Sequence, residues 1–179
     1  SNSMTIENAC QWLQKHSHTI PALEINHQQV IDLFQNEHQA HNLVNIVVSD
    51  PGMSLALLSK VNQKRDPASG REPVESAQAA IAMLGDSVTY QLFKDFSVAE
   101  QSLQQKNQLF LFYQIVNRSF HCEVQAEKWG LNNGYQQLEP ITQAGLLAYI
   151  GETLCCVYDF ANYITVSYTH LTLPTTRLV

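Results

Sequence analysis

The spacing of apolar residues constrains the fold of this chain more than any other feature. Apolar side chains recur every three or four residues along most of its 179 residues, which places them on one face of successive helices. Ala9, Cys10 and Leu13 already show this spacing near the start of the chain. No convincing stretch alternates apolar and polar residues, as a half-buried strand would. The sequence therefore predicts an all-α protein, a bundle of several helices.

Prolines and glycines set the expected helix boundaries. Pro51 suits the first position of a helix, where Ser49 or Asp50 can cap the free backbone N–H groups. Residues 63–73 form the clearest loop, and 99–108 should be an exposed helix or a linker. Glycine stops are expected at Gly85, Gly130 and Gly151. The expected helices cover about 5–15, 74–84, 109–129 and 152–163, and others begin near Asn26, Ala40, Pro51, Asp86 and Pro140.

Charge and composition exclude several classes of protein. The chain has 10 Lys and Arg against 16 Asp and Glu, and this acidic balance disfavours nucleic-acid binding, which rewards clustered positive charge. No apolar run reaches the length of a membrane span, and the N-terminus lacks the pattern of a secretory signal. The 4 cysteines form no CxxC pair or zinc pattern, which favours reduced thiols. We expect a cytoplasmic protein with no cofactor and no nucleic-acid or membrane partner.

Several segments, in a fixed order, carry a resemblance to a known family. They read IPALEINHQQVIDLF at 20–34, IVVSDPGMSLALLSKVN at 46–62, VESAQAAIAMLG at 74–85, RSFHCEVQAEKW at 118–129 and AGLLAYIG at 144–151. Over roughly residues 17–163 the chain resembles the HDOD family, which shows a Ser-Asp-Pro helix junction, a Leu-rich helix ending in Asn and a helix ending in Leu-Gly. This resemblance implies an HD-like helical bundle that acts in bacterial signal transduction.

The last two segments resemble the part of the family that is related to HD phosphohydrolases. Those enzymes use a His, a His-Asp pair and a further Asp to hold one or two metal ions. At the place of the His-Asp pair this chain has Ala148 and Tyr149, and near the first His position it has Arg118. Alanine offers no ligand atom, tyrosine is a poor ligand at neutral pH, and arginine would repel a metal. We therefore predict no metal site, no catalytic residues and no enzymatic activity.

A basic loop is a weaker candidate for a binding site. Residues 60–71 are locally basic in an acidic protein, and this loop could bind a phosphate or an acidic partner. The alternative is that the loop is simply a solvated surface. Its cationic residues are Lys60, Lys64, Arg65 and Arg71.

The histidines offer only weak metal or nucleophile candidates. His38 and His41 are three residues apart and could share a helix face, but no cysteine or carboxylate completes a typical metal set beside them. Cys122 follows His121, yet neighbours on a helix point about 100° apart and cannot easily meet. Surface or core positions are the simpler interpretation of all four residues.

The end of the chain differs in kind from the rest. Residues 166–179, VSYTHLTLPTTRLV, have no helical period, and the first part resembles the translation of a widely used sequencing adapter. We expect an HDOD-like domain over 1–165 that is truncated at its C-terminus, followed by a non-native tail over 166–179; the alternative is a genuine short strand. A truncated bundle would leave Leu154, Val157 and Phe160 without cover, so a tendency to self-associate is expected.

These observations favour one function and leave two alternatives. The favoured hypothesis is a non-catalytic regulatory or output domain that acts through contacts with an unidentified protein partner of a signalling pathway. The first alternative is a divergent metal-dependent phosphohydrolase that recruits His38 and His41. The second alternative is a module that binds an anionic nucleotide through the 60–71 loop.

Overall fold

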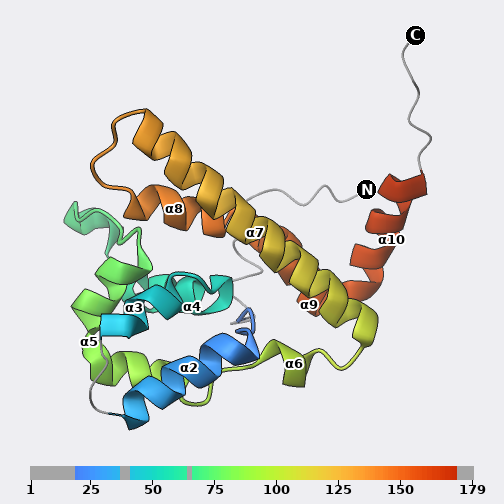
Figure 1. Ribbon diagram of the computed structural model, residues 1–179, viewed down its shortest axis with the longest axis horizontal. Coiled ribbons are helices and arrows are strands. Elements are labelled where there is room, and N and C mark those ends of the chain that lie inside the picture. The colour runs from blue at the N-terminus through green and yellow to red at the C-terminus, as the bar shows by residue number, and fades with distance from the viewer. Residues whose placement is uncertain (1–18, 37–40, 64–65, 173–179) are drawn as a thin grey trace.

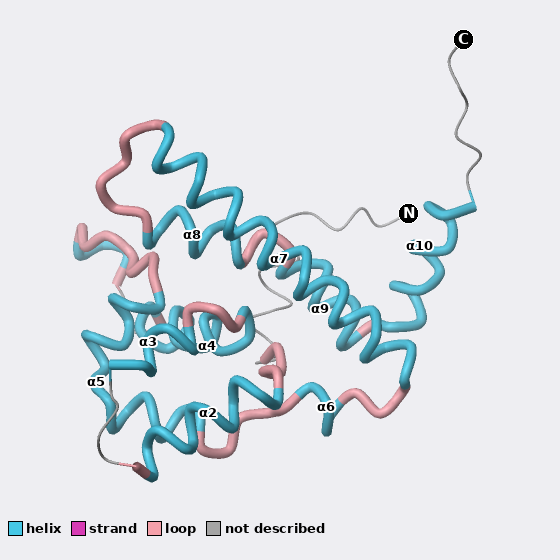
Figure 2. Tube along the Cα trace, viewed as in Figure 1, coloured by secondary structure: helices cyan, strands magenta, loops and turns pink. Residues whose placement is uncertain are grey.

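The computed structural model describes residues 19–36, 41–63 and 66–172, and in this part of the chain the secondary structure is helical (Figures 1 and 2). A single isolated bridge between Ala22 and Val98 is the only β pairing there. The all-α prediction is confirmed, whereas the helix expected over 5–15 lies outside the described residues. The helices are α2 (Glu24–Gln35), α3 (His41–Val47), α4 (Pro51–Asn62), the 3₁₀ turn η1 (Pro67–Ser69), α5 (Ala77–Phe93), α6 (Ala99–Ser102), α7 (Lys106–Asn132), α8 (Glu139–Leu146), α9 (Ile150–Tyr158) and α10 (Phe160–Thr172).

The helices pack around two clusters of buried side chains. The first cluster belongs to α2, α3, α4 and α5 and contains Met53, Leu57 and Phe93. The second belongs mainly to α6, α7 and α9 and contains Phe112 and Ile115. In Figure 1 the long α7 runs beside α8 and α9, while α10 turns away from them. The amphipathic pattern of the sequence is thus used twice, once on each side of the molecule.

The buried carboxylate of Asp50 joins the start of α2 to the start of α4. Oδ1 accepts a hydrogen bond from the Met53 backbone N–H at 2.9 Å, which caps α4 as the sequence predicted. Oδ2 accepts bonds from the Leu23 backbone N–H at 3.0 Å and from Asn26 Nδ2 at 2.9 Å. Burial raises the pKa of Asp50, and these hydrogen bonds act against the rise. Asp50, rather than Ser49, is therefore the cap, and it also fixes the N-terminal lead-in.

The N-terminal lead-in lies directly against the first turn of α4. A Cβ atom at Gly52 would stand 2.4 Å from the Ile20 carbonyl oxygen and 2.8 Å from that of Pro21. Ala22 then bonds to both sides of Val98, since its N–H donates to Ser97 O and its carbonyl accepts from Ala99 N–H. This short segment of chain therefore connects α4 with the start of the second cluster, and only glycine fits at position 52.

Helices α7 and α8 approach each other so closely that their backbones nearly touch. A Cβ atom added at Gly145 would lie 2.8 Å from the Cys122 carbonyl oxygen and 2.9 Å from Glu123 Cα. At Gly151, in α9, an added Cβ would meet nothing within 4 Å. The two glycines of the GLLAYIG segment therefore differ, because packing requires the first and not the second.

Several predicted helix boundaries are confirmed and others are wrong. Gly85 interrupts α5 with a φ of 79°, as predicted. Gly130 does not end α7, which continues to Asn132 because the left-handed turn residue is Gly134, with a φ of 74°. Gly151 lies within α9. The helical structure is interrupted just before it, between the end of α8 at Leu146 and the start of α9 at Ile150.

The helix predicted over 152–163 is in fact two helices. Asp159 leaves the helical conformation, its side chain accepts hydrogen bonds from Asn162 Nδ2, and the chain bends by 117° there. A short acidic side chain that bonds its own neighbourhood competes with the helix, which explains the break. Beyond it, α10 runs on to Thr172, so 166–172 are helical and the expected loss of helical structure from 166 is wrong there. Once its first turn packs on α9, each further residue adds one hydrogen bond at little cost. Residues 173–179 lie outside the described residues, and a truncated domain with a non-native tail stays a prediction.

The late helices are better covered than the sequence suggested. Leu154 is 5% exposed, so the expectation that it lacks cover is wrong. Val157 and Phe160 are half-buried and pack against the second cluster. The turn into α10 supplies this cover, and the sequence pattern did not reveal that turn. Self-association stays a prediction, but these three residues no longer provide its physical basis.

Replacing Asp50 should weaken the junction between α2 and α4. Asp50→Ala removes the acceptor of three hydrogen bonds and leaves buried N–H donors without a partner, so we expect a loss of about 3 kcal/mol in the free energy of unfolding. Urea denaturation measures this loss. The exposed Asp95→Ala is the matched control and should change stability by less than about 0.5 kcal/mol. Equal effects of the two variants would contradict the assigned role of Asp50.

The two glycines of the 145–151 segment should respond oppositely to alanine. Gly145→Ala forces α8 away from α7 and should cost about 1–3 kcal/mol of unfolding free energy. Gly151→Ala adds a methyl group to open space in a helix and should be neutral or stabilising by up to about 1 kcal/mol. Thermal unfolding of both variants measures the contrast. A destabilised Gly151→Ala beside an unchanged Gly145→Ala would refute the close approach.

Candidate functional site

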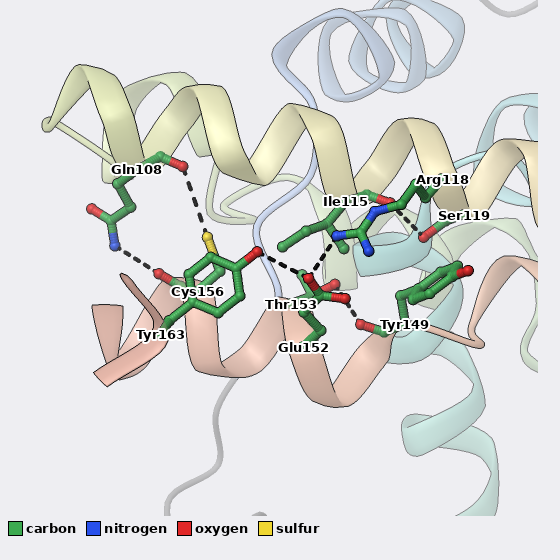
Figure 3. Close-up of polar contacts among 9 residues, drawn as sticks. All are labelled: Gln108, Ile115, Arg118, Ser119, Tyr149, Glu152, Thr153, Cys156 and Tyr163. Carbon is green, nitrogen blue, oxygen red and sulfur yellow. Dashed lines mark hydrogen bonds and ion pairs between the residues drawn. The ribbon is translucent and has the colours of Figure 1, made fainter. Parts of the chain in front are cut away.

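The candidate site lies where α7 and α9 run side by side, and Figure 3 shows its polar contacts. Small hydroxyl side chains allow the two helices to meet there. Ser119 Oγ donates to the Ile115 carbonyl at 3.0 Å, and Thr153 Oγ1 donates to the Tyr149 carbonyl at 2.8 Å. Both hydroxyl residues are buried and satisfied within their own helix, so the interface needs no further polar partner for them.

Two of the residues that the sequence compared with an HD metal site, an arginine and a tyrosine, meet a glutamate between α7 and α9. Arg118 on α7 forms an ion pair with Glu152 on α9, with Nη2 and Oε1 2.6 Å apart. The guanidinium also lies 5.1 Å from the centre of the Tyr149 ring, within the range of a cation–π contact. The hydrogen bond to Glu152 raises the pKa of Arg118, so the cation is fixed at every physiological pH.

Helix α10 closes this cluster through Tyr163. The Tyr163 hydroxyl donates to Glu152 Oε1 at 2.9 Å, so one carboxylate oxygen binds both a cation and a phenol. Burial, with the hydrogen bond to Glu152 second, raises the pKa of Tyr163 to about 12. The bend at Asp159 is what places Tyr163 beside Glu152, and the cluster therefore connects α7, α9 and α10.

A second contact holds the other end of the same helix pair. Gln108 Nε2 donates to the Cys156 carbonyl at 3.1 Å (Figure 3). It also donates to the Val157 carbonyl at 3.2 Å, near the C-terminus of α9. Burial raises the pKa of the Cys156 thiol to about 12, so this sulfur stays protonated and is a poor nucleophile. Cys122, Cys155 and Cys156 are all free cysteines. Polar contacts at both ends thus fix the register of α7 against α9.

The residues of this cluster do not fit a metal ion. Arg118 brings a permanent positive charge, and Glu152, the only carboxylate in the cluster, is already bound to it. Ala148 is exposed beside Tyr149 and offers no ligand atom. Across the described ranges, no three His, Cys, Asp or Glu side chains come together as a metal-binding group. The arrangement connects three helices through one carboxylate.

Sequence reasoning found part of this cluster. It identified Arg118 and Tyr149, and the structure brings them together; Ala148 lies next to them without taking part. It missed Glu152, although the spacing of three residues from Tyr149 puts both on one face of α9. It could not have found Tyr163, because that contact depends on the bend at Asp159.

The basic loop is not a uniform cationic surface. Lys64 and Arg65 lie outside the described residues, and Lys60 and Arg71 are exposed. Arg71 lines a pocket of about 270 Å³, but Asp66 and Glu72 line it as well. These carboxylates reduce the attraction of the pocket for an anion.

The histidine candidates gain no support from the described residues. His38 lies outside them, and His41 is the first residue of α3. His121 is exposed and Cys122 half-buried on α7.

In the part of the chain that the structure covers, no single helix is long and apolar enough to cross a membrane. By length and composition only one bent pair of segments would pass, Glu139–Tyr158 together with Phe160–Ser167, across their 117° bend.

Alkaline titration should reveal the contact between Tyr163 and Glu152. The pKa of Tyr163 in the folded state lies near 12, above the usual 10.0, so its contribution to stability is full below pH 10 and is lost as the pH rises toward 12. We expect Tyr163→Phe to remove one late-titrating tyrosine from the absorbance titration and to flatten the loss of thermal stability over this window. Tyr113→Phe is a comparison variant: burial and its contact with Glu100 raise the pKa of Tyr113 to about 12 as well, so the two variants combined should remove two late-titrating tyrosines. Ordinary titration of Tyr163 near 10 would contradict the contact.

Comparison with known proteins places this geometry in a family. The model of the HDOD domain matches residues 20–170. None of the curated proteins compared with the chain matches it. A solved structure, the MmoQ response regulator from Methylococcus capsulatus strain Bath, has a similar fold, with a TM-score of 0.65 and 19% sequence identity. The similarity covers 84% of this chain but only 60% of MmoQ. The chain belongs to the HDOD family.

Proposed function

We propose that this protein is a non-catalytic output domain of bacterial signal transduction, which acts by contacting another protein in the cytoplasm. Two findings support the signalling role: the chain belongs to the HDOD family, and the solved structure that it resembles is described as a response regulator. The remaining length of MmoQ, about two fifths of that protein, is not matched by this chain. A domain that works together with this one would therefore lie outside the region that this chain shares with MmoQ.

One observation carries the non-catalytic part of the proposal. Arg118, paired with Glu152 and placed over Tyr149, stands where the resemblance locates the metal ligands of HD phosphohydrolases. A divalent cation there would meet a positive charge at close range and would have to compete with it for a single carboxylate. The same three side chains instead join α7 to α9. A site that once activated water has, on this proposal, become a structural contact.

The surface supports the proposal that the protein works through contacts. Trp129 and Tyr135, at the end of α7, are each more than half exposed, and their rings lie 5.4 Å apart. Leu131, between them in sequence, is 58% exposed. Exposed aromatic side chains are enriched where proteins bind one another. Only 15% of the chain is charged, so few charges need to be stripped of water when such a surface is covered.

Metal content and phosphoester turnover test the proposal together. We expect purified protein, supplied with manganese and then dialysed, to retain no stoichiometric metal and to hydrolyse p-nitrophenyl phosphate no faster than a buffer blank. The physical reason is the fixed cation at the metal-ligand position. Elemental analysis and absorbance at saturating substrate provide the two measurements.

The phosphohydrolase alternative makes the opposite prediction. Bound metal in a one-to-one ratio, with turnover that a chelator abolishes and that His38→Ala or His41→Ala also abolishes, would overturn the proposal. Turnover that survives both substitutions would indicate a contaminating phosphatase, which repurification removes. His121→Ala, an exposed histidine on α7, is the matched control for both variants.

A further inference from the structure

A cleft between the two halves of the molecule contains a buried hydrogen-bond donor without a partner. The cleft measures about 630 Å³, is open to solvent, and lies between α4 on one side and α7 and α8 on the other. Gln143, on α8, lines it and is 5% exposed. Its Nε2 atom has no hydrogen-bond partner among the described residues.

The orientation of the Gln143 amide is fixed by its other end. Oε1 accepts a hydrogen bond of 2.8 Å from the backbone N–H of Ala77, the first residue of α5. Only an oxygen can accept from that donor, so the amide cannot be turned over to satisfy Nε2. Gln143 thus links the two halves of the molecule and keeps two buried N–H groups with no acceptor. A buried N–H group without an acceptor lowers the stability of a native protein, and a bound molecule that supplies an acceptor removes this cost.

The other side chains of the cleft define what could supply that acceptor. Most of the lining is apolar, and includes Leu58 from α4, Ala126 from α7, and Ile141 and Leu147 from α8 and its end. Among the described residues that line the cleft, Glu75 is the one that carries a charge, and it is exposed. The cleft therefore favours an apolar group that carries an oxygen acceptor and disfavours a negative charge.

We propose that this cleft docks an apolar, non-acidic peptide segment of a partner protein, with a main-chain carbonyl of the segment accepting a hydrogen bond from Gln143 Nε2. A peptide carries such a carbonyl at every residue beside its apolar side chains. Nε2 itself is buried, so on this proposal the bound segment displaces neighbouring side chains before its carbonyl reaches this atom. The cleft volume falls in the range of established ligand sites. This inference rests on the proposed function and names the surface that performs it.

Peptide selection with matched variants tests this site. A phage-displayed library of random peptides is selected on the protein, and the enriched peptides are synthesised. We expect apolar, non-acidic sequences whose binding shifts the side-chain NH₂ signals of Gln143 in ¹⁵N-labelled protein. Gln143→Glu keeps the acceptor for Ala77 and removes the donor, and should weaken binding about tenfold. Gln125→Glu, the same change at an exposed site of α7, should not.

A second variant blocks the cleft without touching Gln143. Ala144 is exposed and lines the cleft, so Ala144→Phe should abolish peptide binding, while Ala82→Phe on the exposed face of α5 should leave it unchanged. Failure to enrich any peptide, or peptides whose binding survives both Gln143→Glu and Ala144→Phe, would overturn the inference. The remaining signals of each spectrum report whether the variant is folded. The proposed function would survive such a failure, because it is tested separately by metal content and turnover.

Discussion

The arrangement of this protein depends on one buried carboxylate, that of Asp50. It caps α4 through Met53 and, through Leu23 and Asn26, holds the start of α2. Because burial raises the pKa of Asp50, the charged form is disfavoured in the folded state. The contribution of this group to stability therefore falls as the pH rises above the ordinary pKa of an aspartate. Three donors offset that cost at neutral pH. The junction therefore forms only when all of its parts are in place.

From this junction the chain is guided into the second half of the molecule. The lead-in that Asp50 fixes packs its Ile20 and Pro21 carbonyls on Gly52, and Ala22 then bonds to the backbone on either side of Val98. The second half closes through its own contacts, since Arg118, Glu152 and Tyr163 connect α7, α9 and α10. On the proposed function, this contact takes the place of the metal site that the resemblance to HD phosphohydrolases implies.

Local signals in the sequence predicted the parts of the fold that are governed by local chemistry. A cap at Ser49 or Asp50, Pro51 at the start of α4 and the break at Gly85 each depend on one or two residues. Each is confirmed, and the structure selects Asp50 as the cap. The family resemblance singled out Arg118 and Tyr149 as replaced metal-ligand positions, and the structure places the Arg118 guanidinium 5.1 Å from the centre of the Tyr149 ring.

Features that depend on distant residues could not be predicted. The contact of Tyr163 with Glu152 requires the 117° bend, and the amide of Gln143 meets Ala77 across 66 positions of the chain. Gly130 looked like a helix stop, but it is a site of close packing against Leu138, and the turn falls to Gly134. In each case tertiary packing decides between alternatives that are equal in the local sequence.

The claim that a fixed cation has replaced the metal site can be tested most directly with manganese. A titration of Mn²⁺ into ¹⁵N-labelled protein reports any bound ion through the broadening of backbone signals near it. The account predicts no selective, saturable broadening at Arg118, Tyr149 and Glu152, because the guanidinium already occupies the carboxylate. Selective broadening of these three signals at one equivalent of Mn²⁺ would contradict it.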